Sequence, residues 1–136
     1  MPDNPYFPRL FSPPNVGGRT LRNRIALPAT LTNYGAGHRV TERSIDFLAE
    51  RAKGGCGLIV TEVVAVDPAA LAHGAIIAGY AAENEEGFKR TAAAVEGEGA
   101  CQLRELQDGR EGSDRHHQHR AEPDREPQAL RVDNVT

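Results

Sequence analysis

Leu58-Ile-Val-Thr-Glu-Val63, which follows directly on Arg51-Ala-Lys-Gly-Gly-Cys-Gly57, decides the fold of this 136-residue chain. The glycines are typical of a helix end and a turn, and the apolar run after them is typical of a strand covered on both faces. A second run of this kind, Ile25-Ala-Leu-Pro-Ala29, lies upstream. The chain therefore alternates strand, helix and strand, as a β/α barrel or a doubly wound sheet does.

Two amphipathic helices are predicted on either side of that strand. The first follows Thr41, a suitable N-cap, and ends at Gly54-Gly55. Its apolar stripe consists of Ile45, Leu48, Ala49 and Ala52. The second begins near Asn84, has glutamates in its first turn and ends near Gly97. Its apolar face consists of Phe88, Ala92 and Val95. Both helices should pack on the strands.

Composition excludes several functional classes. The formal charge is −3 with 39% hydrophobic residues, which gives no basic surface for nucleic acid. The N-terminus lacks the features of a targeting peptide, and no apolar run is long enough to span a membrane. Cys56 and Cys101 are far apart and lack a CxxC context, so we expect free thiols, with neither a disulfide framework nor a zinc site. We expect a cytoplasmic protein; its oligomeric state stays open.

Composition changes near residue 100. Residues 101–136 hold 14 of the 35 charged residues and few apolar ones, which predicts disorder from about Gly112 onward. The bias resembles a shifted reading frame. His116-His-Gln-His119 is an alternative, metal-binding feature, but a disordered tail is the favoured interpretation. Cys101-Gln-Leu-Arg-Glu-Leu106, where a third strand belongs, is poorly encoded, because Arg104 and Glu105 put one charge on each face.

The first ninety or so residues contain several ordered sequence blocks: Leu10-Phe-Ser-Pro13, Val16-Gly-Gly-Arg-Thr-Leu-Arg-Asn-Arg-Ile25, Pro28-Ala-Thr30, Gly54-Gly-Cys-Gly-Leu-Ile-Val-Thr-Glu62 and Glu86-Gly-Phe88. Together these blocks resemble the Old Yellow Enzyme family of FMN-dependent NAD(P)H:flavin oxidoreductases, which includes 2,4-dienoyl-CoA reductase. The resemblance implies an α/β fold: the N-terminal portion of a (β/α)8 barrel, incomplete, with a disordered C-terminal tail. Residues 1–100 would be a partial FMN-binding barrel, and residues 101–136 a tail outside the family, disordered or frame-shifted.

The resemblance also implies which residues contact the cofactor. Pro28, Ala29 and Thr30 match the segment along the flavin, where the Thr30 hydroxyl would bond near the flavin carbonyl and N5. Val63 matches the position whose backbone approaches the ring. NAD(P)H would be the reductant, and a small molecule such as an activated alkene the substrate. No residue is assigned a catalytic role.

Two further side chains near this segment have open roles. Glu62 is either a general base or, as we favour, a structural carboxylate paired with a neighbouring strand or with the Asn23-Arg24 pair. Tyr34 lies where family members often have an aromatic residue against the substrate, and simple packing explains it equally well.

The resemblance fails after Gly99. Glu105 falls where the family has a glutamine that bonds the flavin pyrimidine edge, and Gln102 lies too early to replace it. The residues that polarise the substrate and bind the phosphate belong to segments this chain does not contain. A barrel needs roughly 250 residues. We therefore expect this chain alone to be unstable, aggregation-prone and inactive. The alternative function is a noncatalytic truncated or frame-shifted remnant.

Overall fold

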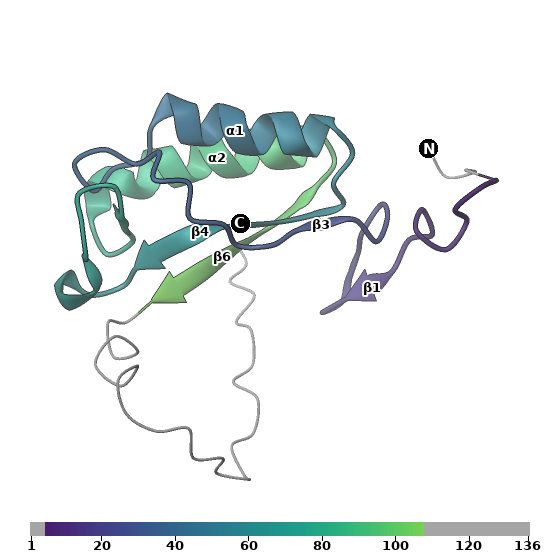
Figure 1. The fold of residues 1–136 in the computed structure, drawn as a ribbon, viewed down its shortest axis with the longest axis horizontal. Coiled ribbons are helices and arrows are strands. Elements are labelled where there is room, and N and C mark those ends of the chain that lie inside the picture. Colours follow the sequence, from purple (N-terminus) through teal and green to yellow (C-terminus); the bar gives the residue numbers. More distant parts are fainter. Residues whose placement is uncertain (1–4, 108–136) are drawn as a thin grey trace, which may run out of the picture.

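The computed structural model describes residues 5–107. A short antiparallel hairpin of β1 (Asn15–Val16) and β2 (Arg19–Thr20) precedes a segment in which strands and helices alternate (Figure 1). That segment consists of β3 (Ala26–Leu27), α1 (Glu42–Lys53), β4 (Leu58–Ala65), β5 (Ile77–Ala78), α2 (Glu85–Gly97) and β6 (Cys101–Gln107). Two 3-10 turns, Pro68–Ala70 and Ala82–Asn84, lie between β4 and α2. The predicted alternation is confirmed.

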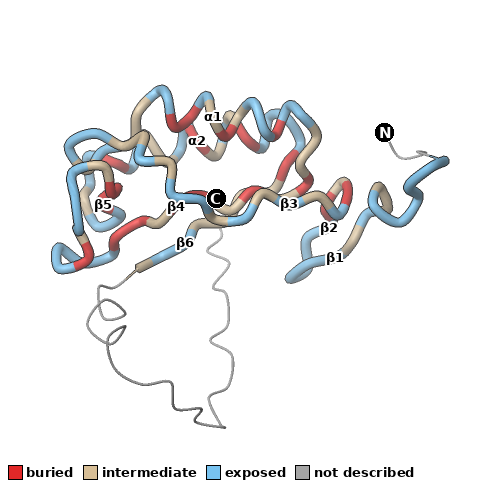
Figure 2. The backbone as a smooth tube through the Cα atoms, viewed as in Figure 1, coloured by how far each residue is buried: buried red, intermediate tan, exposed pale blue. Residues whose placement is uncertain are grey.

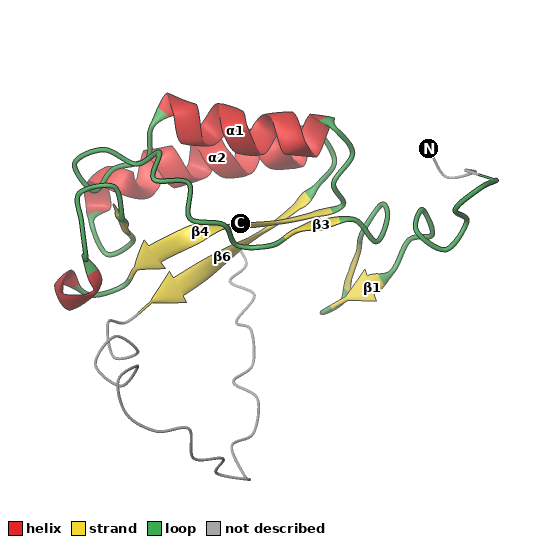
Figure 3. Ribbon diagram, viewed as in Figure 1, coloured by secondary structure: helices red, strands yellow, loops and turns green. Residues whose placement is uncertain are grey.

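β4 is the central strand of a parallel sheet. It pairs with β3 at Leu58 and Ile59, with β5 at Val64 and Ala65, and with β6 from Leu58 to Ala65. Both helices cover the same face of this sheet, and Figure 3 shows no helix against the other face in the described part of the chain. The result is an open two-layer β/α arrangement. None of the helices within residues 5–107 combines the length and apolarity needed to cross a bilayer.

α1 begins where the sequence predicts. Thr41 is the N-cap: its hydroxyl accepts from the Ser44 amide at 3.3 Å, while the Thr41 amide donates to the Ser44 hydroxyl at 3.1 Å. This reciprocal pair satisfies two backbone donors that the helix start would otherwise leave unpaired. The helix ends at Gly54, and Gly55 turns the chain with a φ of 109°, in the left-handed region that favours glycine. The Gly54–Gly57 loop is therefore a helix end and turn, as expected.

The core lies between the helices and the sheet. Ile59 and Val95 are completely buried there, and the buried segments on the facing sides of the two layers are visible in Figure 2. Burying side chains of this size contributes about 1.5–3 kcal/mol each. The cluster consists of Leu48, Ala52, Ile59, Val95 and Ala100, with Leu27, Phe47 and Cys56 packed against it. It joins α1, α2, β4 and Ala100, the residue just before β6.

The expectation of a poorly encoded third strand is wrong. β6 forms seven residues long and pairs with β4 along most of its length. The charges of Arg104 and Glu105 are tolerated because the two side chains lie on opposite faces of the strand, in different surroundings. The Arg104 guanidinium lies 4.3 Å from the centre of the Phe88 ring on α2, a cation–π contact. Glu105 is exposed on the face without helices. The predicted tail and the histidines at 116, 117 and 119 lie outside the described residues.

The Arg22 side chain forms hydrogen bonds at the C-terminal ends of both helices. Its guanidinium donates to the Ala52 carbonyl, to the Cys56 carbonyl at 2.6 and 3.1 Å, and to the Glu98 carbonyl at 2.5 Å. Carbonyls at helix ends lack partners within the helix and carry a partial negative charge. A single cation thus stabilises α1, α2 and the turn into β4 at the amino-terminal edge of the sheet.

Candidate functional site

The residues predicted to contact a cofactor lie around the carboxyl ends of β3 and β4. Pro28, Ala29 and Thr30 directly follow β3, whose last residue is in register with Ile59 of β4. Pro28 and Thr30 are exposed, and Ala29 and Val63 are partly buried. The Thr30 hydroxyl donates to the Pro28 carbonyl at 3.2 Å. In parallel β/α proteins this edge is where ligand sites form.

β4 contains a bulge beside this edge. Val60 is in register with Leu103 and Val63 with Glu105, so Thr61 and Glu62 together stand opposite Arg104 alone. Bulges break the simple alternation of a strand and redirect a side chain. Both Thr61 and Glu62 are buried, each at 7% exposure, which a regular strand with one open face would not give.

Val63 and Glu105 lie on the open face of the sheet. As register partners they point to the same side. That side is opposite to the helices, because Arg104, the neighbour of Glu105, reaches Phe88 on α2. The position matched to the family's glutamine thus faces the same space as Val63. Gln102, in register with Ile59, lines a cavity on the helix side, so it is no substitute.

Glu62 binds the loop that follows Thr30. One of its carboxylate oxygens, Oε2, accepts from the Thr32 amide at 2.9 Å, the Thr32 hydroxyl at 2.9 Å and the Asn33 amide at 3.2 Å. The structural role is as expected, but of the two expected partners the Asn23-Arg24 pair is wrong, and the bonds go to the loop that follows the neighbouring strand β3. Asn23 donates instead to the Gly55 carbonyl, and Arg24 donates to the Ser12 hydroxyl. With three donors on one oxygen, the carboxylate is poorly placed to act as a base.

Tyr34, at the end of this loop, packs against α1. Its ring meets Phe47 edge to face at 5.5 Å between centroids, and the Arg43 guanidinium lies 4.0 Å from its centre. The Thr41 hydroxyl donates to the Tyr34 carbonyl at 2.6 Å. These contacts are those of the packing alternative. They hold the far end of the loop to the start of α1.

Asn84 organises the neighbouring loops, and the sequence did not indicate this role. Its side chain is 2% exposed and donates to the carbonyls of His38 at 2.8 Å and Ala78 at 2.9 Å. It accepts from the Val40 amide at 3.0 Å. An asparagine just before a helix suggests an N-cap, but this one makes no side-chain capping bond. Only the tertiary fold reveals its partners.

A cavity of about 30 Å³ lies between the sheet and the helices. That volume holds one or two water molecules. Its polar lining includes Ser44, Thr61, Glu62, Thr91 and Gln102. The Gln102 side-chain oxygen Oε1 is buried without a hydrogen-bond partner in the described residues. Across those same residues no group of three or more His, Cys, Asp or Glu side chains is placed to hold a metal.

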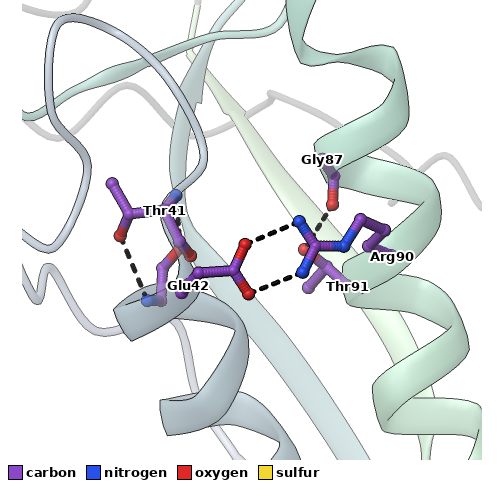
Figure 4. Close-up of polar contacts among 6 residues, drawn as sticks. Thr41, Glu42, Gly87, Arg90 and Thr91 are labelled. Atoms are coloured by element: carbon purple, nitrogen blue, oxygen red, sulfur yellow. Dashed lines mark hydrogen bonds and ion pairs between the residues drawn. The ribbon is translucent and has the colours of Figure 1, made fainter.

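The strongest charge pair joins the helices and lies outside the candidate site. The Arg90 guanidinium donates to both oxygens of Glu42, at 2.6 and 2.5 Å (Figure 4). These hydrogen bonds lower the pKa of Glu42 and raise that of Arg90. Beside the pair, the Thr91 hydroxyl donates to the Gly87 carbonyl at 2.8 Å. A side chain at Gly87 would collide with Val40, at 2.7 Å, so glycine permits α2 to lie close to the loop before α1.

Comparison with known proteins places these features in a family context. A model of the NADH:flavin oxidoreductase / NADH oxidase family matches residues 9–133. Among curated proteins, the NADH oxidase of Thermoanaerobacter brockii is 44% identical over 63 residues, covering 46% of this chain and 10% of that protein. The metal reductase of Desulforamulus reducens is 36% identical over 94 residues, covering 67% of this chain and 14% of that protein.

Solved structures give the same picture. A 2-naphthoyl-CoA reductase complex superposes with a TM-score of 0.69 at 27% identity, covering 74% of this chain and 16% of that one. The old yellow enzyme of Trypanosoma cruzi superposes with a TM-score of 0.67 at 25% identity, covering 76% and 28%. The fold expected from the sequence, an incomplete N-terminal portion of a (β/α)8 barrel, is confirmed. The match to the family model continues past residue 100, and a domain boundary there stays a prediction.

Proposed function

We propose that this chain, which belongs to the NADH:flavin oxidoreductase / NADH oxidase family, supplies the first flavin-facing surface of an FMN-dependent NAD(P)H oxidoreductase. The observation that carries the proposal is that Pro28–Thr30 follow β3 at the carboxyl edge of the sheet, where β3 pairs with β4, the strand that contains the half-buried Val63. The chain spans 10% and 14% of the two curated relatives above, so the activity of a whole enzyme is part of this proposal.

These four residues fit a flavin. Pro28, Ala29 and Val63 offer apolar atoms to an aromatic ring, and Thr30 offers a hydroxyl donor. The bond from that hydroxyl to the Pro28 carbonyl, at 3.2 Å, is long for an O–H···O bond, so an acceptor on a ligand can replace it. When bound, FMN supplies the hydride chemistry between NAD(P)H and a small-molecule substrate, which we propose to be an activated alkene.

Glu105 does not fit. It shares the open face with Val63, where the family resemblance places a glutamine amide. An ionised carboxylate accepts hydrogen bonds and cannot donate one to a flavin carbonyl oxygen. At this position the chain therefore opposes flavin binding.

We further propose that the isolated chain does not hold FMN stoichiometrically and does not oxidise NAD(P)H. A barrel of this type needs roughly 250 residues. Within the described residues, β4 pairs with three parallel strands, β3, β5 and β6, and one face of this sheet carries no helix (Figure 3). A flavin resting on this surface alone would stay largely in water, where hydrogen bonds contribute little net affinity.

FMN titration of the purified chain tests both parts. Weak binding should protect the backbone around Pro28–Thr30 and Val63 from hydrogen exchange at high FMN concentration, with no NADH consumption. Protection elsewhere with none at these residues would refute the assignment of the surface. Stoichiometric FMN on the purified protein, or NADH oxidation, would refute the proposed inactivity.

A further inference from the structure

We propose that Glu62 is the positioning residue for the flavin-facing segment: its buried carboxylate fixes the loop after Thr30 and thereby sets the path of Pro28–Thr30. The inference deepens the proposed function and rests on it for the identity of the ligand. Its structural part, the anchoring of the loop, can be tested without any flavin.

The carboxylate makes all its recorded contacts to one short segment. Oε2 accepts from the amides of Thr32 and Asn33 and from the Thr32 hydroxyl, at 2.9 to 3.2 Å. Hydrogen bonds to an ionised acceptor are stronger than neutral ones, and burial to 7% exposure reduces competition from water. Consecutive backbone amides that converge on one oxygen leave the loop little freedom at these residues.

The Thr32 hydroxyl extends this anchor. While it donates to Glu62, it accepts from the Tyr34 amide at 3.3 Å. The backbone at Asn33 has a φ of 58°, a left-handed conformation that asparagine tolerates better than most residues. Thr30 lies only two residues before Thr32, so a displacement of the anchored amides moves the Thr30 hydroxyl as well.

The β4 bulge makes the contact possible. In a regular strand, adjacent side chains point to opposite faces. If Val60 kept its place on the face of Glu105, Glu62 would lie on that face too, and Val63 would point away from it. The extra residue between Val60 and Val63 lets Glu62 stay buried against the loop while Val63 remains on the open face in register with Glu105. The bulge thus accounts for both the buried position of Glu62 and the open-face position of Val63.

Hydrogen exchange followed by mass spectrometry on the full 136-residue chain tests the anchor. Glu62→Gln keeps the shape of the side chain, but its amide oxygen is uncharged, so the three donors lose their charge-assisted acceptor. Peptides covering residues 29–34 should exchange about tenfold faster than in the wild type, while peptides from α1 and α2 stay unchanged. Thr32→Val, which removes only the hydroxyl, should act in the same direction, and the two effects should be less than additive.

Glu105→Gln is the matched control. It makes the same chemical change on the next strand, at an exposed carboxylate, and should leave the exchange of residues 29–34 unaltered. Unchanged exchange in Glu62→Gln would overturn the inference. So would equal acceleration in α1 and α2, which would make Glu62 a general support of the fold, or an equal effect of Glu105→Gln, which would make the effect one of charge alone.

FMN titration of the same proteins separates the inference from the proposed function. If wild type shows no FMN-dependent protection at residues 28–34, the proposed function fails, and the FMN-free exchange still decides the anchor. If wild type shows it, Glu62→Gln should weaken FMN binding at least severalfold. An equal dissociation constant for the two proteins would overturn the positioning role.

Discussion

Replacing Arg22 with methionine removes the guanidinium that binds the C-terminal ends of both helices. Methionine keeps an unbranched apolar stem of similar length, so the loss concerns the hydrogen bonds more than the packing. Three carbonyls lose a donor: Ala52, Cys56 and Glu98. The Ala52 carbonyl keeps the bond from the Gly55 amide at 2.9 Å, so the partly buried Cys56 carbonyl is the one that loses its only donors among the described residues.

The expected loss follows from these contacts. A hydrogen bond to a charged group contributes roughly 1.5–3 kcal/mol. The bond to Glu98 is exposed and counts for little, whereas those to Ala52 and Cys56 are partly buried. We therefore expect a decrease of about 3 kcal/mol in the free energy of unfolding, against a typical total of about 5–15 kcal/mol for a domain. Arg22→Lys should lose less, because an ammonium retains the favourable charge at the helix ends.

Urea unfolding followed by circular dichroism measures this decrease through the midpoint at constant m-value. Arg24→Met is the control, because the Arg24 side chain makes only an exposed hydrogen bond, to the Ser12 hydroxyl, among the described residues. Its effect should lie within about 0.5 kcal/mol of the wild type. A difference below about 1 kcal/mol between the two variants would refute the role assigned to Arg22, since leaving the partly buried Cys56 carbonyl unpaired costs about that much.

Other substitutions test other parts of the molecule. Glu105→Gln should tighten FMN binding, measured by quenching of flavin fluorescence, because it replaces a repelling carboxylate by a donor; unchanged or weaker binding would contradict the placement of the flavin. Gln102→Leu should raise the free energy of unfolding by about 1 kcal/mol, because it removes a buried oxygen without a partner; a decrease in urea unfolding would mean that water in the cavity satisfies that oxygen. The lowered pKa of Glu42 predicts acid sensitivity. The contribution of its pair with Arg90 is present above the ordinary carboxyl pKa of 4.5 and is lost as pH falls through the lower folded value, so Glu42→Gln should flatten the acid side of a stability curve.

The helices and the main strand could be predicted because their signals are local. Thr41 caps α1 through hydrogen bonds with Ser44, three residues away, and the apolar run from Leu58 marks a buried strand by its composition alone. The segment of β6 was expected to be a poorly encoded strand because the same reasoning assumed cover on both faces. Arg104 finds a ring on α2, and Glu105 lies on the face without helices, which no local pattern shows.

The contacts around the candidate site could not be predicted for a related reason. The partners of Glu62 depend on a bulge, and the bulge depends on the register between β4 and β6. Asn84 bonds residues 38, 40 and 78, which come together only after β5 and the loop before α1 are in place. The resemblance supplied Pro28–Thr30 and Val63 as a set, but not the residue that holds them.

The two edges of the sheet differ in what they do: one stabilises the fold, and the other forms the proposed cofactor surface. At the amino-terminal edge Arg22 stabilises the helix ends through the carbonyls of Ala52, Cys56 and Glu98. At the carboxyl edge Glu62 shapes a surface that, in our proposal, binds only one part of a flavin. In β/α barrels chemistry resides at the carboxyl edge and stability at the other. Substitutions at Arg22 therefore report on folding, while Glu105 reports on the cofactor surface. Because Glu62 is buried and its side-chain hydrogen bonds among the described residues all go to the carboxyl-edge loop, its substitution tests how strongly folding and the cofactor surface are coupled.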